Sequence, residues 1–227
     1  MSCIKRVLCL LWYMGPALLL AQEDFTGYLQ PALALNYKVT PTYSHNFSFS
    51  PRIFFRREGE TGLRTRHMDL RHFSSVRWGP EGSVGFGILY RFRENFEASR
   101  EDELRLTQQF NLTARPGVVR MGHRLRAQQR IQPSRTVHRF RYRFALDGPL
   151  EGDKLDVGEA YWIGSLESLL SVGKGIKPQH DIRATSWVGY LWSEGFKIQG
   201  GAQYRQEDYT GDSTPVLFFL TSLVVFL

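Results

Sequence analysis

The 227-residue sequence predicts an all-β protein, an antiparallel up-and-down transmembrane β-barrel of about 10–12 strands that follows a cleaved signal peptide. Apolar and polar side chains alternate with period two through nearly the whole chain, as in strands whose two faces meet different surroundings. After residue 21 no stretch of about 20 residues is continuously apolar, so we expect no membrane-spanning helix in the mature chain.

Residues 1–21 are predicted to be a secretory signal peptide. Lys5 and Arg6 precede an apolar run, and the small residue Ala21 ends that run just before a polar segment. The run is shorter than the roughly 20 apolar residues that a spanning helix needs. We therefore expect residues 22–227 to form a single exported barrel domain.

Eleven segments show the alternation, and each is expected to be a strand. In the first of them Leu33 and Leu35 alternate with Ala34 and Asn36. Single-chain bacterial barrels normally have an even number of strands, so ten or twelve are expected, with one segment misread or outside the barrel. The segments are residues 29–39, 43–56, 68–78, 84–93, 104–112, 119–131, 139–146, 157–170 (ambiguous in phase), 180–192, 196–205 and 216–227.

The connections between strands are expected to differ in length at the two ends of the barrel. Proline, glycine and small polar residues predict short turns, and longer polar stretches predict loops. In outer-membrane barrels the short turns face the periplasm and the long loops face the exterior. Short turns are expected near Thr40, Gly79, Pro116 and Ser193, and loops at residues 57–63, 97–102 and 207–214.

Arginines decide which face of each strand meets lipid. Residues 119–131 and 139–146 carry arginine at alternate positions, opposite apolar side chains. An arginine at a lipid-facing midplane site costs about 2 to 4 kcal/mol, so the arginines are expected to line the lumen. The predicted lumen cluster contains Arg91, Arg93, Arg105, Arg120, Arg124, Arg126, Arg130, Arg139, Arg141 and Arg143, with Asp69, Glu103, Glu159, Asp181 and Glu207 as the acids within reach.

A soluble antiparallel sandwich or lipocalin-like barrel would show the same alternation, with its arginines in water. The length of most of the segments, ten or more residues, favours the membrane, and so do aromatic residues toward the ends of the strands. These aromatics are Tyr28, Tyr37, Tyr43, Trp78, Tyr90, Trp187 and Trp192.

The formal net charge of +7 falls by two, to +5, when Lys5 and Arg6 leave with the signal peptide. Because the arginines alternate along strands instead of forming runs or a helical stripe, nucleic acid is not an expected partner. Both cysteines, Cys3 and Cys9, lie in the signal peptide, so the mature chain is expected to contain no disulfide.

Several segments carry a resemblance to a known family. They are residues 86–93 (FGILYRFR), 103–110 (ELRLTQQF), 120–126 (RMGHRLR) and 138–144 (HRFRYRF), together with Tyr204-Arg205. With these the chain resembles a family of outer-membrane β-barrel proteins of unknown function that is common in Bacteroidetes, from about Phe25 to Leu227. The resemblance implies the outer membrane of a Gram-negative bacterium, with membrane lipid, lipopolysaccharide and the insertion machinery as partners, and it supplies no catalytic or binding residue.

Two functions remain open for the lumen. The arginines could pair with acids, amides and water in a packed polar network, which gives a structural or passage role at the cell envelope. Alternatively, unpaired guanidinium groups could form an anion-selective pore or bind an anionic ligand. No cofactor is expected, and no His, Cys, Asp or Glu cluster has metal-ligand spacing.

An enzyme is the alternative from another class, although no catalytic residue is predicted. His72 and Ser74 share the lipid-facing side of one segment, as a base and a nucleophile of a lipid hydrolase would. A hairpin turn at residues 79–82 places His72 opposite residue 88 or 90, so Glu94, the nearest lipid-facing acid, lies roughly 13 to 20 Å away. Without a third group the hydrolase is not the expected function.

Overall fold

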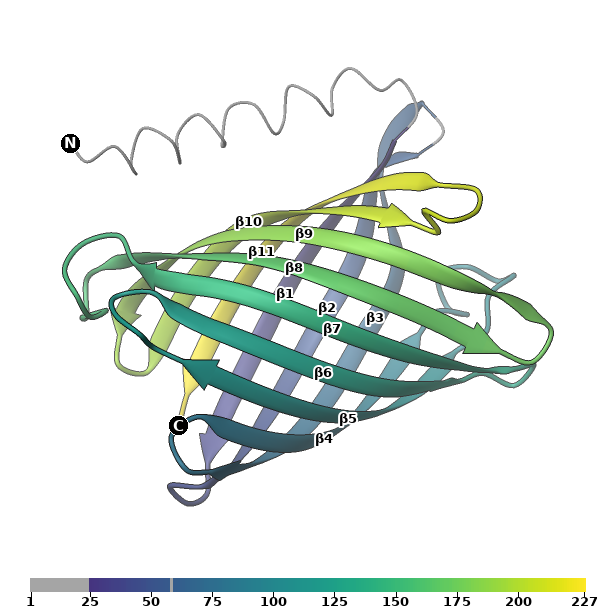
Figure 1. Cartoon of the computed structure of the whole chain (residues 1–227). Coiled ribbons are helices and arrows are strands. Elements are labelled where there is room, and N and C mark those ends of the chain that lie inside the picture. The colour runs from purple at the N-terminus through teal and green to yellow at the C-terminus, as the bar shows by residue number, and fades with distance from the viewer. Residues whose placement is uncertain (1–24, 58) are drawn as a thin grey trace.

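A computed structural model describes residues 25–57 and 59–227, which form eleven strands in one closed barrel (Figure 1). Within these residues no helix is both long and apolar enough to cross a membrane. The predicted signal peptide lies outside them. The strands are β1 (Thr26–Lys38), β2 (Tyr43–Arg57), β3 (Glu60–Trp78), β4 (Gly82–Phe92), β5 (Glu103–Ala114), β6 (Arg120–Ile131), β7 (Thr136–Pro149), β8 (Ala160–Gly173), β9 (Ile176–Ser193), β10 (Phe196–Glu207) and β11 (Thr214–Phe226).

Each strand pairs with its sequence neighbours in antiparallel fashion, and one parallel pair closes the barrel. That pair is β1 with β11, in continuous register from Thr26 opposite Val216 to Asn36 opposite Phe226. The expectation of ten or twelve strands was therefore wrong, and all eleven predicted segments are strands. An even number is required only when every neighbouring pair, including the closing one, is antiparallel.

The odd number of strands places the two ends of the described chain at opposite rims. We call the rim where β1 begins the N-terminal rim and the rim where β11 ends the C-terminal rim. The connections described at the N-terminal rim are residues 59, 93–102, 132–135, 174–175 and 208–213. Those at the C-terminal rim are residues 39–42, 79–81, 115–119, 150–159 and 194–195.

The predicted short turns all lie at the C-terminal rim, but two loop lengths differ from expectation. Residues 57–63 are mostly strand, because β2 continues to Arg57 and β3 starts at Glu60. Residues 150–159 form a ten-residue connection at the rim that otherwise has short turns. The alternation of apolar residues fades in residues 60–67, so the sequence pattern could not reveal this part of β3.

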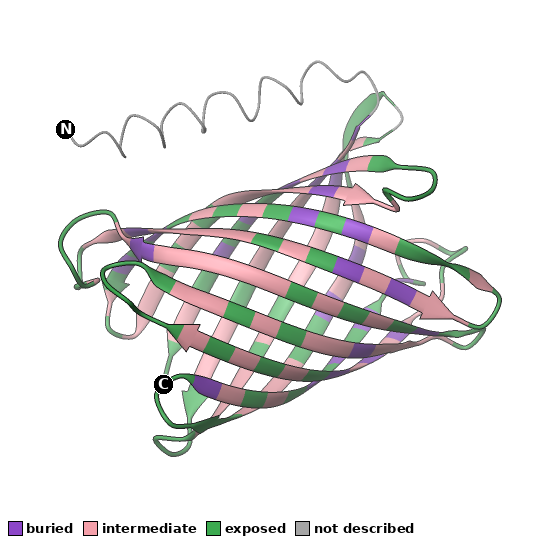
Figure 2. Ribbon diagram, viewed as in Figure 1, coloured by how far each residue is buried: buried purple, intermediate pink, exposed green. Residues whose placement is uncertain are grey.

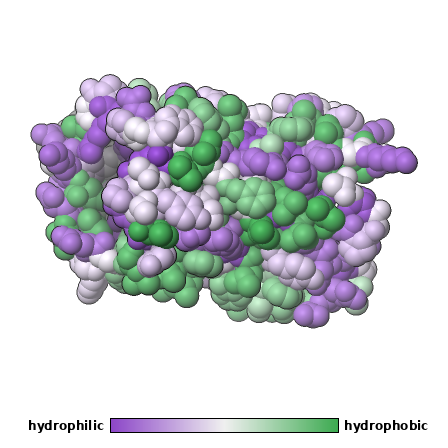
Figure 3. Space-filling model, turned by 90° about the horizontal axis from the view of Figure 1, so that it is seen from below, coloured by the Kyte–Doolittle hydropathy of each residue, from purple (hydrophilic) through white to green (hydrophobic). Residues whose placement is uncertain are grey.

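Side chains alternate between the lumen and the outer face, and Figure 2 shows the resulting change of burial along the strands. The outer face exposes large apolar side chains such as Leu33, Phe86 and Leu125. The structure also resolves the phase of β8, since Leu169 is 1% exposed inside the barrel whereas Leu166 is 60% exposed outside it. Figure 3 shows hydrophobic residues between two hydrophilic ends on one side of the molecule.

An apolar cluster fills part of the lumen near the N-terminal rim. It consists of Tyr28, Phe54, Val216, Phe218 and Leu220, with Trp187 packed against it. Phe218 is fully buried, stacks on Tyr28 at 4.9 Å, and lies under the guanidinium groups of Arg52 and Arg205. Tyr28 and Trp187 therefore point inward and do not belong with the aromatic residues of the outer face, because period two alone does not say whether an aromatic ring faces lipid or a packed lumen.

The loop of residues 93–102 at the N-terminal rim is held by one carboxylate and gives a pH prediction. Burial alone would raise the pKa of Asp102, but the backbone N–H groups of Arg93 and Glu94, at 2.7 and 3.0 Å, and the Tyr90 hydroxyl lower it below its ordinary value. The stabilisation is thus present above the ordinary pKa of about 3.9 and is lost as the pH falls through the lower pKa of the folded state.

Hydrogen exchange should detect this loss. We expect the Arg93 and Glu94 amides to be protected at neutral pH and to lose protection below about pH 4, with Asp102→Asn unprotected at every pH. Asp212→Asn, at an exposed position in another loop of the same rim, is the control and should behave as the wild type. Protection that persists in Asp102→Asn would contradict this account of the loop.

Candidate anion site in the barrel lumen

The predicted basic cluster lines the lumen from β4 to β7, and toward the N-terminal rim Arg91, Arg105 and Arg130 form ion pairs. Arg91 donates two hydrogen bonds of 2.6 Å to the carboxylate of Asp69. Glu103, which is 1% exposed, accepts hydrogen bonds from both Arg105 and Arg130. Two carboxylates thus pair with three arginines in this half of the lumen, where most of these side chains are buried.

A second set of ion pairs lies on β7, β8 and β9. Glu167 lies 3.7 Å from Arg141 and 3.3 Å from Arg183, and Asp181 lies 3.2 Å from the same Arg183. The sequence did not identify Glu167 as a partner, because the phase of residues 157–170 was ambiguous. Glu159, which was expected in the lumen, instead lies in the 150–159 connection and accepts a hydrogen bond from the Asp156 backbone.

Three further arginines of the predicted cluster differ in burial and in their partners. Arg93 follows β4 and is buried, whereas Arg120 lies exposed at the C-terminal rim and pairs with Asp147 at 3.0 Å. Arg139 donates to the hydroxyl of Ser171 at 2.9 Å.

Two further luminal arginines, Arg124 and Arg126, donate hydrogen bonds to neutral side chains. Arg124 donates to the Asn111 side-chain oxygen at 2.9 Å, and Arg126 donates to the Gln109 side-chain oxygen at the same distance. Within residues 25–57 and 59–227, the ion pairs include none from Arg71, Arg124, Arg126 or Arg143. The lumen of β3, β6 and β7 therefore holds positive charge that these side chains do not neutralise.

The pairing register brings these positive charges close together. Arg124 is directly opposite Arg143, and Arg126 is directly opposite Arg141, on adjacent strands and on the same face. Like charges in directly opposite positions destabilise a sheet. The Nε atoms of Arg141 and Arg143 are also buried without a hydrogen-bond partner in the described structure. A bound anion would both offset the repulsion and accept these hydrogen bonds.

A cavity of about 40 Å³ lies where these arginines converge. Its lining includes Arg71, Arg105, Arg126 and Arg141, together with Thr107 and Gln128, and we call it the arginine cavity. A water molecule needs about 10–15 Å³ of such space, so the cavity has room for about three waters or one small anion. Thr107 and Gln128 hydrogen-bond to each other at 2.9 Å, and Gln128 also accepts a bond from Arg141 at 3.1 Å.

The arginine cavity lies at the boundary between a closed and an open part of the lumen. Leu89, Arg105 and Thr107, toward the N-terminal rim, are at most 7% exposed. Arg71 and Arg77, toward the C-terminal rim, are exposed although they face inward. Solvent therefore reaches the arginine cavity from the C-terminal rim.

The other sequence candidates, His72 and Ser74, lie on the outer face. His72 is opposite Ile88, as predicted, and Glu94 lies in the loop beyond the end of β4, away from both. The structure brings His45 of β2 to them instead: its Nδ1 atom is 3.0 Å from Nε2 of His72 and 3.1 Å from Oγ of Ser74. His45 sits on the lipid-facing side of its segment, and cross-strand register, which one sequence does not fix, was needed to find it.

The described residues contain no group of three or more His, Cys, Asp or Glu side chains placed to hold a metal ion.

Comparison with protein families identifies the chain. The profile of a family described as "Protein of unknown function (DUF2490)" matches residues 31–214, which run from β1 to the start of β11. The chain belongs to the DUF2490 family. This confirms the expected membership of a family of unknown function, and the family description names no lineage, ligand or reaction.

A search of curated proteins finds no match to this DUF2490 chain. Among solved structures, an anion-selective porin from Comamonas acidovorans is similar over 82% of this chain and 53% of its own, with 12% sequence identity and a TM-score of 0.39. The DUF2490 chain thus spans about half the length of that porin.

Proposed function

We propose that this protein is an outer-membrane barrel of a Gram-negative bacterium that binds a small anion in the arginine cavity. The observation that carries the proposal is the convergence of four arginines on one cavity, at a place where Arg126 and Arg141 oppose each other directly. Because the lumen is packed beyond the cavity, the site suits binding of an anion that enters from the C-terminal rim more than free passage.

The membrane location rests on the outer surface. Large apolar side chains cover the outer faces of the strands, and the aromatic residues Tyr37, Trp78, Tyr90 and Trp192 lie near strand ends and are exposed. Such a face is costly in water and suits the lipid and the interfaces of a bilayer. Heat-modifiable migration of the protein in the outer-membrane fraction tests this location, and recovery as a soluble periplasmic protein would refute it.

Removing one arginine tests the anion site. We expect Arg126→Gln to weaken binding of inorganic phosphate about 10-fold to 100-fold, because a charge-assisted hydrogen bond contributes about 1.5 to 3 kcal/mol. Isothermal titration calorimetry of the folded protein in detergent at low salt measures the affinity. Arg77→Gln makes the same change of charge at a luminal position outside the cavity lining and is the matched control.

The outcomes separate a site from a general positive field. Loss of affinity in Arg126→Gln with little change in Arg77→Gln supports the arginine cavity. Equal weakening in both variants, or no phosphate binding by the wild type, would overturn the proposal.

A further inference from the structure

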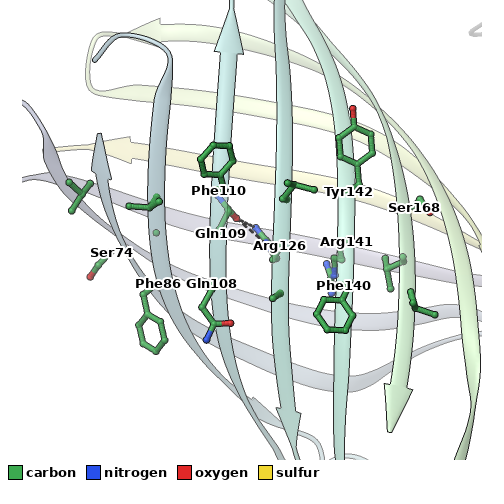
Figure 4. Close-up of a pocket in the computed structure, with 17 residues that line it drawn as sticks. Ser74, Phe86, Gln108, Gln109, Phe110, Arg126, Phe140, Arg141, Tyr142 and Ser168 are labelled. Atoms are coloured by element: carbon green, nitrogen blue, oxygen red, sulfur yellow. Dashed lines mark hydrogen bonds between the residues drawn. The ribbon is translucent and has the colours of Figure 1, made fainter. Parts of the chain in front are cut away.

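A large hollow lies on the outer face of the barrel, on the lipid-facing side of β3 to β8. It has a volume of about 880 Å³ and runs across the strands between two rows of outward side chains. Phe110 and Tyr142 belong to one row, and Phe86 and Phe140 belong to the other, as Figure 4 shows. The small side chain of Ala127 lies between Gln108 and Phe140 in the second row and leaves the hollow open. We call this hollow the outer trough.

Ser74 forms the β3 end of the outer trough, next to two histidines that lie outside its lining. The register places His45 of β2 directly opposite Ser74, and His72 precedes Ser74 by two residues on the same face of β3. Aromatic neighbours hold both imidazoles: the Phe47 ring stacks on His72 at 4.6 Å, and the Tyr43 ring meets His45 edge-on at 4.8 Å. The serine and its neighbours are thus positioned by strands and not by loops.

The distances in this cluster suit proton transfer. Nδ1 of His45 lies 3.0 Å from Nε2 of His72, so Nδ1 can donate a hydrogen bond to His72 once it carries a proton. The Ser74 hydroxyl lies 3.1 Å from the same Nδ1 atom, within the range for a nucleophile and its base. A proton that leaves Ser74 for Nδ1 of His45 would then be hydrogen-bonded to His72.

We propose that Ser74 is the nucleophile of a lipid acyl hydrolase, with His45 as general base and the outer trough as the acyl-chain site. This inference rests on the proposed membrane location and is independent of the anion site. An apolar trough on a lipid-facing surface admits an acyl chain without removing it from the membrane, and the carbonyl carbon of its ester can then reach Ser74.

The reaction needs only the ester and water. Ser74 Oγ attacks the ester carbonyl carbon while its proton passes to Nδ1 of His45. The tetrahedral intermediate then expels the lipid alkoxide, which takes that proton, and leaves an acyl-serine. Water activated by His45 attacks the acyl-serine, releases the fatty acid and restores the serine hydroxyl. His72 is a positioning residue that accepts the hydrogen bond of protonated His45.

Two neighbouring serines on opposite faces of β3 provide the test. Wild-type protein and the Ser74→Ala, His45→Gln and Ser75→Ala variants are refolded into vesicles of phosphatidylethanolamine and phosphatidylglycerol, and released fatty acid is measured. We expect Ser74→Ala and His45→Gln each to lower release by at least about 100-fold, the usual contribution of such groups. Ser75→Ala, on the lumen-facing side of the same strand and outside the trough lining, should leave it unchanged.

Two further measurements keep the proposal falsifiable if a variant fails to fold. A fluorophosphonate probe should label Ser74 in the wild-type barrel and not Ser168, which lies at the β8 end of the same trough, as read by mass spectrometry. His72→Gln should shift the pH dependence of fatty-acid release, which a purely structural loss would leave in place. Absence of both release and labelling in the wild type, or release that is unchanged in folded Ser74→Ala, would overturn the proposal.

Discussion

The Glu103→Gln substitution is expected to destabilise the barrel by about 3 to 5 kcal/mol, the usual cost of breaking a buried ion pair from one side. Glu103 is the carboxylate shared by Arg105 and Arg130, and Arg91 lies directly opposite it on β4. A neutral side chain of the same shape leaves two guanidinium groups without their counter-charge in a part of the lumen that excludes water.

Urea unfolding in vesicles, followed by tryptophan fluorescence, measures this loss. Glu94→Gln is the matched control, because Glu94 is exposed in the loop that precedes β5 and the same change of charge should cost little there. If both variants unfolded at the same urea concentration as the wild type, Glu103 would not hold the arginines of this layer together.

The Phe218→Ala substitution is the second large effect and concerns the closed half of the lumen. Phe218 is 0% exposed, at the centre of the apolar cluster and beneath Arg52 and Arg205. Truncating a buried phenylalanine costs about 3 to 5 kcal/mol, because the transfer free energy is lost and a cavity remains. The loss should also loosen the packing that closes the lumen toward the N-terminal rim.

Two measurements test this substitution, with Phe219→Ala as the control. Phe219 is the neighbour of Phe218 in the chain, faces outward and is 48% exposed. Phe218→Ala should lower the urea midpoint and raise the ion conductance of single barrels in a planar bilayer, whereas Phe219→Ala should do neither to a comparable extent. Equal conductance in the wild type and Phe218→Ala would show that the apolar cluster does not close the lumen.

Period-two alternation was enough to predict the strands and to place the arginines inside. The segments of residues 119–131 and 139–146 fixed the inward face because arginine against lipid is costly. The expected even number of strands was wrong. The direction in which β1 pairs with β11 is set when the barrel closes, and the sequences of the two strands do not show it.

The candidate sites were predictable only in part, for a similar reason. A single sequence shows which face a side chain occupies but not which residue of another strand lies opposite it. The arginines of the arginine cavity were therefore expected in the lumen, whereas the opposition of Arg126 and Arg141 was not. Glu167 and His45 were missed because their roles depend on register with β7, β9 and β3.

Because β1 and β11 pair in parallel, the described chain begins at one rim of the barrel and ends at the other. In a barrel with an even number of antiparallel strands both ends of the polypeptide emerge on one side, and a fused reporter at either end samples the same compartment. Here, in the proposed membrane location, a reporter at the start of β1 and one at the end of β11 would stand on opposite sides of the bilayer. Two partners fused to these ends would be held apart by the whole height of the barrel and joined by one continuous chain.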